Sequence, residues 1–324
     1  MNSVDDDRGR HADSPTEVPA KGWKDIAVRV KDEIGDDNTS LASAGVSFFG
    51  FLSLVPGLAA VISIYAMFAD PMEIQRQLSE WLGNLPEEAR ALITGQISRL
   101  SEQTTGALTW GTVVAVGLAL WMASSGMSNL IKAINMAYDE EDQRNFLVRR
   151  GLALLLSMGA ILLLVAIVFA ITAVFPWLSE LTGSAMAAGV GQVVAWILAG
   201  AAFAFALAVL YRVGPHRDKP EWKWVSWGSI VAVILWLVAT VLFRIYVANF
   251  ATYDETYGSL AAVVILLFWL YITSFVVLLG AQINAEAEHQ TRADTTVGRH
   301  EPMGQRDAEM ADTLGSTRAE DPDR

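Results

Sequence analysis

The chain has 324 residues, of which 53% are hydrophobic and 18% are charged, and its formal net charge is -12. So few charges among so many apolar residues indicate a membrane protein with several spans and exclude an ordinary soluble domain. Residues 1–40 and 285–324 each hold 10 of the 35 acidic residues, so the acidity lies mostly in the tails and argues against a nucleic-acid partner. The absence of cysteine excludes disulfides, thiolate metal sites and cysteine nucleophiles.

The N-terminal part of the chain changes from a polar tail to an amphipathic pattern. Residues 1–20 are polar and acidic without a hydrophobic period, which predicts a disordered tail. Within residues 21–40, apolar side chains recur at helical spacing from Trp23 to Ile34, with four basic residues around them. This pattern predicts a cytoplasmic amphipathic helix on the inner membrane surface. Packing of this helix against the protein's own inner loops is the alternative.

The first uncharged run predicts a transmembrane helix that contains a proline. It covers about residues 41–68 and includes Pro56, which removes a backbone donor and bends or breaks a helix. Freed backbone groups at membrane depth are tolerated where protein or a water-filled cavity satisfies them. Pro56 is therefore a candidate for a substrate path, and an ordinary proline kink is the alternative.

Five further apolar runs predict transmembrane helices. Before them, residues 69–105 carry two amphipathic patterns, which predict an outer helical loop. The five spans cover about residues 106–131, 151–175, 185–211, 225–250 and 260–283, which completes a six-helix transmembrane domain within residues 41–288. The fourth of the six spans is rich in Ala and Gly, which permits close approach between helices. Residues 289–324 are polar and acidic, so we expect a disordered tail there.

The distribution of Lys and Arg predicts the orientation in the membrane. The N-terminal segment, the second-to-third connection, the fourth-to-fifth connection and the C-terminal tail hold six, four, four and five of these residues. The opposite side holds three, all in the outer loop. Because basic residues favour the cytoplasmic side, both termini are predicted to lie in the cytoplasm.

Arg244 is the single ionisable residue within the six apolar runs. A charge at the centre of a membrane costs about 2.5 to 3.5 kcal/mol on insertion scales, so such a residue either snorkels to the interface or faces the bundle interior. In the second case we expect Arg244 to bind an anionic head group in a cavity that opens outwards, near Asp254 or Tyr257. Tyr253 and Gly258 belong to the same outer segment, where an aromatic belt and a helix start are the ordinary alternatives.

Two sets of residues at the inner side are further candidates. Arg144, Arg149 and Arg150 satisfy the positive-inside rule, and the alternative is that they hold anionic head groups. Gln282 closes the sixth span, where it either caps or bridges helices or belongs to the substrate path.

No catalytic or metal-binding pattern accompanies these candidates. The four histidines lie in the tails or in an inner loop, and the chain has neither H-x-x-x-H spacing nor a Walker-type glycine loop. We therefore expect no metal, no cofactor and no enzymatic activity, and a metal-dependent membrane ribonuclease is disfavoured.

Several stretches resemble the YihY/BrkB family of bacterial inner-membrane proteins, some of which long carried the name ribonuclease BN. The matching stretches are A-S-A-G-V-S-F-F-G-F-L-S-L-V-P at 42–56, N-x5-N-x2-Y-D with R-N-F-L-V-R-R within 129–150, and Y-D-E-T-Y-G-S-L with L-L-G-A-Q-I-N within 253–284. The resemblance covers about residues 22–288 and implies a six-helix protein of the cytoplasmic membrane. It also implies that transport of lipids or amphiphiles is one activity to consider. Gln282 stands where the family pattern has Glu, which puts any proton-carrying role of that position in doubt.

Together these observations predict an all-α polytopic membrane protein with six transmembrane helices and amphipathic surface helices. We expect a transporter or flippase-like carrier of an anionic lipid or amphiphile, with membrane lipids as partners and with homo-oligomers left open. The alternative is a non-transporting membrane scaffold or envelope-organising protein. A polar strip facing the bundle interior favours the carrier, whereas a sealed apolar interior favours the scaffold.

Overall fold

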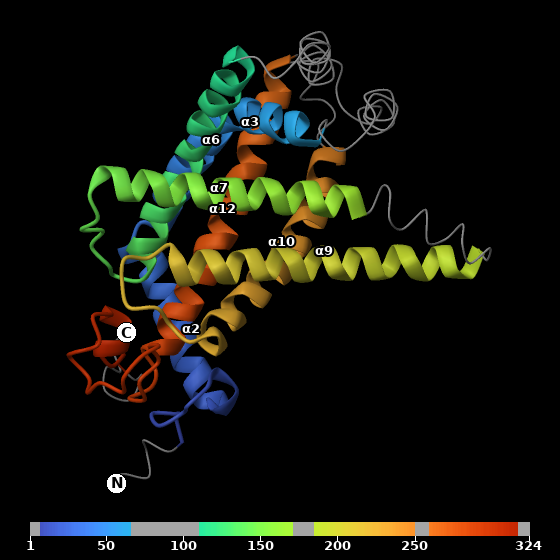
Figure 1. Ribbon diagram of the computed structural model, residues 1–324. Helices are drawn as coiled ribbons and strands as arrows, with labels where there is room; N and C mark the ends of the chain where they lie inside the picture. The colour runs from blue at the N-terminus through green and yellow to red at the C-terminus, as the bar shows by residue number, and fades with distance from the viewer. Residues whose placement is uncertain (1–6, 66–109, 171–184, 250–258, 317–324) are drawn as a thin grey trace.

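The computed structural model describes residues 7–65, 110–170, 185–249 and 259–316, and within these ranges the chain is helical and forms no β-strand of more than an isolated bridge. The described part contains six long helices (Figure 1). These are α3 (Thr39–Tyr65), α6 (Trp110–Ala137), α7 (Phe146–Phe169), α9 (Ala185–Val213), α10 (Trp222–Asn249) and α12 (Ser259–Glu288). The predicted all-α class is therefore confirmed.

Four segments are long and apolar enough to cross a membrane, namely Phe146–Phe169, Val193–Val213, Trp222–Val247 and Val263–Glu288. Their outward faces carry large exposed apolar side chains, such as Leu147, Trp196 and Leu242. An apolar surface of this kind suits contact with lipid rather than with water. The chain is therefore a multi-pass membrane protein. The predicted spans 41–68 and 106–131 fall partly outside the described residues and stay predictions.

The long helices do not all run parallel. Figure 1 shows α7 and α9 lying alongside one another and crossing α6 and α12 at a large angle. Helix α3 packs against both α6 and α12, and α10 packs against α9 and α12. Ala153 of α7 is fully buried within the main hydrophobic cluster.

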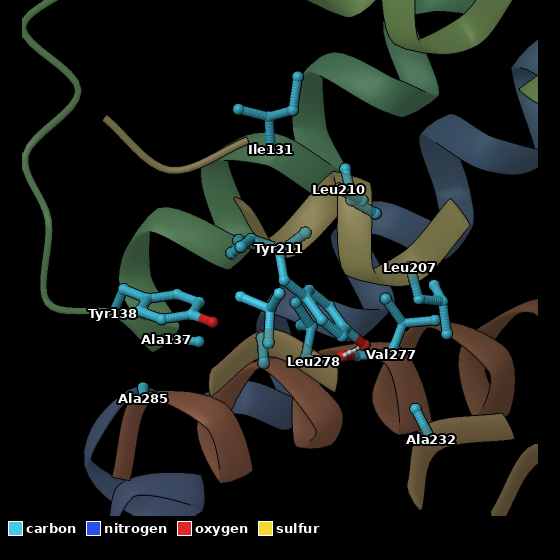
Figure 2. Close-up of a cluster of buried hydrophobic side chains, with 14 of the residues drawn as sticks. Ile131, Ala137, Tyr138, Leu207, Leu210, Tyr211, Ala232, Val277, Leu278 and Ala285 are labelled. Atoms are coloured by element: carbon cyan, nitrogen blue, oxygen red, sulfur yellow. Dashed lines mark hydrogen bonds between the residues drawn. The ribbon is translucent and has the colours of Figure 1, made fainter. Parts of the chain in front are cut away.

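Helix α12 is the centre of the packing, since α2, α3, α6 and α10 all contact it. Its neighbour α10 approaches closely at a pair of glycines: a Cβ built on Gly228 would lie only 2.1 Å from the carbonyl oxygen of Gly280. Figure 2 shows the adjoining core, where the Tyr211 hydroxyl of α9 donates a hydrogen bond of 2.7 Å to the carbonyl oxygen of Val277. This contact fastens α9 to α12.

The predicted N-terminal amphipathic helix is present as α2 (Ala20–Asp36). Its apolar residues Ile26 and Val30 are buried in a cluster with Trp224 of α10 and Ala287 of α12. Helix α2 therefore packs against other parts of the protein, as in the second of the two alternatives above, rather than presenting these residues to the membrane surface.

The tails differ from the prediction. Residues 7–19 and 289–316, which were expected to be disordered, pack together at the end of the molecule where both described ends of the chain lie (Figure 1). Buried Arg10 donates hydrogen bonds to the carbonyl oxygens of Gln290 and Gly315. Buried Arg306 donates to four more carbonyl oxygens, those of Arg292, Ala293, Glu301 and Ala311. Arginine donors thus hold these segments together, although few apolar residues are present.

Two short helices belong to these segments: the 3-10 helix η1 (Pro15–Glu17) and α13 (Glu309–Asp312). Met310 and Ala311 of α13 are buried against the rest of the protein.

Candidate functional site

A cavity of about 280 Å³ lies between α3, α6, α7 and α12. Most of its wall is formed by small or apolar side chains. Four serines from three of these helices add hydroxyl groups to the wall, and they are Ser47, Ser53, Ser157 and Ser274. The described interior is therefore neither sealed nor wholly apolar.

Glycines create the shape of the cavity. A Cβ on Gly126 of α6 would lie 3.2 Å from the Ser53 hydroxyl, so α3 and α6 are in close contact beside the cavity. The Gly126 N–H donates a hydrogen bond of 3.0 Å to that hydroxyl, which itself donates to the carbonyl oxygen of Phe49 at 2.7 Å. In contrast, a Cβ on Gly50 would meet nothing within 4 Å, so the space in front of Gly50 is open.

Ser157 of α7 is the unusual polar group in the wall. Its side-chain oxygen is buried without a hydrogen-bond partner in the part of the chain that the structure describes, and the residue is 6% exposed. Buried hydroxyls nearly always have a partner, so this one is suited to pair with a polar atom of a ligand or with water.

Pro56 lies inside α3 between two cavity residues, Leu54 and Gly57. Of the predicted bend or break, the structure has no break, because α3 continues as a helix from Thr39 to Tyr65. Figure 1 shows instead that the later part of α3 turns aside from its first part. A bend without a break is expected where proline removes one donor and crowds the preceding turn.

Arg244 is exposed on α10, among the exposed apolar side chains of Leu242 and Ile245. No residue of α10 lines the cavity described above, so this cavity lacks Arg244. Tyr253, Asp254, Tyr257 and Gly258, which the sequence placed near Arg244, lie outside the described residues.

The three inner arginines have different surroundings. Arg144 forms two hydrogen bonds with the carboxylate of Asp142, at 2.7 and 2.9 Å, and a third with the carbonyl oxygen of Gly214, at 2.7 Å. Its charge is therefore already neutralised, and its role is to tie the α6–α7 connection to the end of α9. Arg149 is half-buried near the start of α7.

Arg150 is held in place but retains free donor capacity. Its guanidinium lies 4.4 Å from the centre of the Trp121 ring and donates to the Ser125 hydroxyl at 3.2 Å. Its Nε–H has no hydrogen-bond partner within the described ranges. Helical geometry puts Trp121 and Ser125 on the opposite face of α6 from the cavity residues Ala123 and Gly126. Arg150 is therefore a separate candidate for anionic groups, across α6 from the cavity.

Gln282 bridges two helices near the C-terminal end of α12. Its side-chain amide donates to the Thr39 hydroxyl at 2.8 Å and lies 3.4 Å from Oδ2 of Asp37. Its Oε1 atom is buried and has no hydrogen-bond partner among the residues that the structure describes. The neighbouring Asn284 accepts the Gly228 N–H at 2.7 Å and so fastens α12 to α10.

Carboxylates surround this bridge. Burial raises the pKa of Asp37 to about 6 and that of Glu33 to about 7, and the carboxylates of Asp139 and Glu286 add to both shifts. In the sequence, Glu33 and Asp37 stood out only as part of the acidity of residues 1–40. The like-charged i, i+4 spacing on one face of α2 was the signal that could have drawn attention to them.

Comparison with known proteins identifies the family. The sequence model of the family "Virulence factor BrkB" matches residues 30–304. The chain belongs to the BrkB family. The resemblance seen in the sequence is therefore confirmed.

Relatives in the BrkB family are similar over most of their length. The chain is 27% identical over 252 residues to the ribonuclease-like protein YfkH of Bacillus subtilis, covering 75% of this chain and 88% of YfkH. It is 27% identical over 255 residues to a UPF0761 membrane protein of Idiomarina loihiensis, covering 78% and 87%. It is 24% identical over 294 residues to a UPF0761 membrane protein of Alteromonas mediterranea, covering 83% and 95%. No solved structure matches the chain.

The name of YfkH raises the question of nuclease chemistry in this BrkB-family chain. Among the described residues, no three His, Cys, Asp or Glu side chains form a group that could hold a metal ion. The expectation that the protein is not an enzyme stays a prediction.

The serines of the cavity were missed in the sequence because each looked like an ordinary residue of a spanning helix. A signal was present in α3, where Ser43, Ser47, Gly50, Ser53 and Gly57 follow one another at spacings of three or four residues. Such a stripe of small and hydroxyl side chains on one face indicates a helix contact or a lined cavity.

Proposed function

We propose that this BrkB-family protein is a carrier of an anionic lipid or amphiphile in the bacterial cytoplasmic membrane, with both termini in the cytoplasm. The observation that carries the proposal is the serine-containing cavity between α3, α6, α7 and α12. Its four serines add hydroxyl groups to an otherwise apolar wall, which supports a carrier over a scaffold with a sealed apolar interior.

The size and chemistry of the cavity suggest which part of an amphiphile it holds. Small-molecule pockets span roughly 300 to 1,000 Å³, so a cavity of about 280 Å³ accommodates part of a lipid rather than a whole one. Its apolar wall suits an acyl chain. The unpartnered Ser157 hydroxyl suits an ester or amide oxygen at the start of that chain.

The anionic head group requires a cation, and Arg150 replaces Arg244 as the candidate. The guanidinium of Arg150 is fixed by the Trp121 ring and has an unpaired donor. Because Arg150 and the cavity lie on opposite faces of α6, a carried amphiphile would contact them one after the other. Arg244, exposed at the outer part of α10, is then free to act as an interfacial anchor.

Binding is tested by native mass spectrometry of the protein released from mild detergent, with phosphatidylglycerol added as the probe. Gly50→Leu fills the open space of the cavity, and Gly45→Leu is the matched control because it adds the same side chain to an exposed position of α3. We expect one tightly held lipid on the wild type and on Gly45→Leu, and its loss on Gly50→Leu. Equal, loosely held lipid on all three proteins would favour the scaffold.

A further inference from the structure

A buried polar stripe connects the cavity with the inner end of the α3–α12 contact. On α3, the buried residues Ser53, Ser47, Ser43 and Thr39 follow one helical face from the cavity to the first turn. On α12, Ser274 lines the cavity and Gln282 lies eight residues further, about 12 Å along the helix axis. Thr39 and Gln282 then meet at 2.8 Å.

The stripe ends at an unsatisfied acceptor. Gln282 is 2% exposed, and among the described residues its Oε1 atom has no hydrogen-bond donor. Its Nε2 atom already uses Thr39 and Asp37 as acceptors. Gln282 Oε1 therefore lacks a hydrogen-bond donor, in a side chain that contacts the carboxylate of Asp37.

The groups that face Asp37 are mostly acidic. Glu33 and Asp36 come from helix α2, Asp139 from the turn that follows α6, and Glu286 from α12. The cationic groups nearby are already engaged with the last of these carboxylates, since Arg29 forms an ion pair with Glu286 and His289 lies 3.6 Å from it. Burial and these neighbours raise the pKa of Asp37 to about 6, so it takes up a proton near neutral pH.

We propose that Asp37 is a proton-binding site reached from the terminus-bearing end of the molecule, and that Gln282 transmits its protonation to the α3–α12 contact. When Asp37 is ionised, it accepts the Gln282 Nε2–H. When a proton from water adds to its carboxylate, the new O–H donates to Gln282 Oε1, which gains the donor it lacks, and Nε2 keeps Thr39. Release of the proton to water restores the first arrangement.

A proton fits this site better than a divalent metal ion does. Within the described ranges, no group of three His, Cys, Asp or Glu side chains could hold a metal. Because α3 and α12 both line the cavity, a change in their contact reaches the cavity wall. This last step, the coupling of proton uptake to amphiphile binding, rests on the proposed function.

Proton binding is tested by infrared titration of the purified full chain in lipid nanodiscs between pH 4 and 9. The carbonyl band of a protonated carboxyl group is followed in the wild type, in Asp37→Asn, and in the neighbouring controls Asp36→Asn and Glu33→Gln. We expect one carboxyl component with a midpoint near pH 6 that is lost only in Asp37→Asn, and a second with a midpoint near pH 7 that is lost only in Glu33→Gln. A component near pH 6 that survives Asp37→Asn, or that is absent from the wild type, overturns the assignment.

Transmission is tested with a spin label on Gly50→Cys, since the chain has no other cysteine. The label's mobility should change with the same midpoint in the wild-type and Asp36→Asn backgrounds and stay constant with Asp37→Asn. A mobility that does not respond to pH overturns the transmission step. Neither measurement needs an added amphiphile, so failure of phosphatidylglycerol to bind in the mass-spectrometric experiment refutes the carrier without affecting the proton site.

Discussion

The side-chain amide of Gln282 on α12 donates a 2.8 Å hydrogen bond to the hydroxyl of Thr39, the first residue of α3. Both residues are almost completely buried, so the bond joins the two helices where solvent does not compete for it. It also sets the amide beside Asp37, at the end of α2. The Gln282 side chain thus connects α2, α3 and α12 at one end of the polar stripe that leads to the cavity.

The pH dependence of stability follows from the two raised carboxyl pKa values. Because the pKa of Asp37 is about 6 and that of Glu33 about 7 in the folded protein, the native state binds more protons than the unfolded state between about pH 4 and 7. Their contribution to stability is present at low pH and is lost as the pH rises through these values. We expect the thermal midpoint to fall between pH 5 and pH 8, and Asp37→Asn to flatten this slope. A slope that is unchanged in Asp37→Asn would contradict the pKa assignment.

Removal of Arg29 should cause a large loss of stability. Arg29 pairs with Glu286 and donates to Gln290 Oε1 at 2.9 Å and to the carbonyl oxygen of Ser316 at 3.1 Å. Arg29→Ala leaves a buried carboxylate without its partner, which typically costs about 3 to 5 kcal/mol. We expect a lower thermal midpoint and faster proteolysis within residues 289–316.

The control for Arg29 is Lys31→Ala, which removes a basic side chain of the same helix from an exposed position. Lys31→Ala should change neither measurement. Equal behaviour of the two variants would show that the ion pair contributes little.

The contact between α10 and α12 should not accept a side chain at Gly228. A Cβ there would lie 2.1 Å from the Gly280 carbonyl oxygen and 2.6 Å from Asn284 Oδ1. Gly228→Ala therefore pushes the helices apart, and overpacking of this kind costs about 1 to 3 kcal/mol or more. Gly159→Ala on α7, where a Cβ meets nothing within 4 Å, should be neutral or slightly stabilising. Thermal unfolding of both variants in one detergent compares the two positions.

The orientation in the membrane can be measured directly on the cysteine-free chain. Single cysteines replace Ser14 near one terminus and Val297 near the other, both in described segments at the same end of the molecule. We expect a membrane-impermeant thiol reagent to label neither residue in intact cells and to label both in inverted membrane vesicles. Labelling of either residue in intact cells would contradict the cytoplasmic orientation.

The sequence predicted the helices well where hydrophobicity alone determines them. The fifth predicted span, 225–250, corresponds to α10 from Trp222 to Asn249. The sixth was predicted to end at residue 283, whereas α12 continues to Glu288. A span predicted from hydropathy ends where charged residues begin. Here Glu286 and Glu288 are buried in ion pairs with Arg29 and Arg217, so the helix continues past the apolar run.

The parts that the sequence missed depend on contacts between distant segments. The two tails are ordered because Arg10 and Arg306 donate hydrogen bonds to backbone carbonyl oxygens. Amino-acid composition does not reveal which carbonyl groups will accept such bonds. The cavity depends on the way α7 crosses α6 (Figure 1), and a crossing angle is not encoded in the hydrophobicity of either helix. The role of Arg244 as anion partner stays a prediction, since the segment expected beside it, from Tyr253 to Gly258, lies outside the described residues.

The most direct test of the carrier proposal is movement of lipid across a membrane. Purified wild type, Gly50→Leu and Gly45→Leu are reconstituted into vesicles that contain fluorescent phosphatidylglycerol, and a membrane-impermeant quencher reports how much of the probe reaches the outer leaflet. We predict that the wild type and Gly45→Leu accelerate this movement and that Gly50→Leu reduces it to the rate of protein-free vesicles. Movement at the protein-free rate with the wild type, or equal acceleration by all three proteins, would contradict carriage through the cavity.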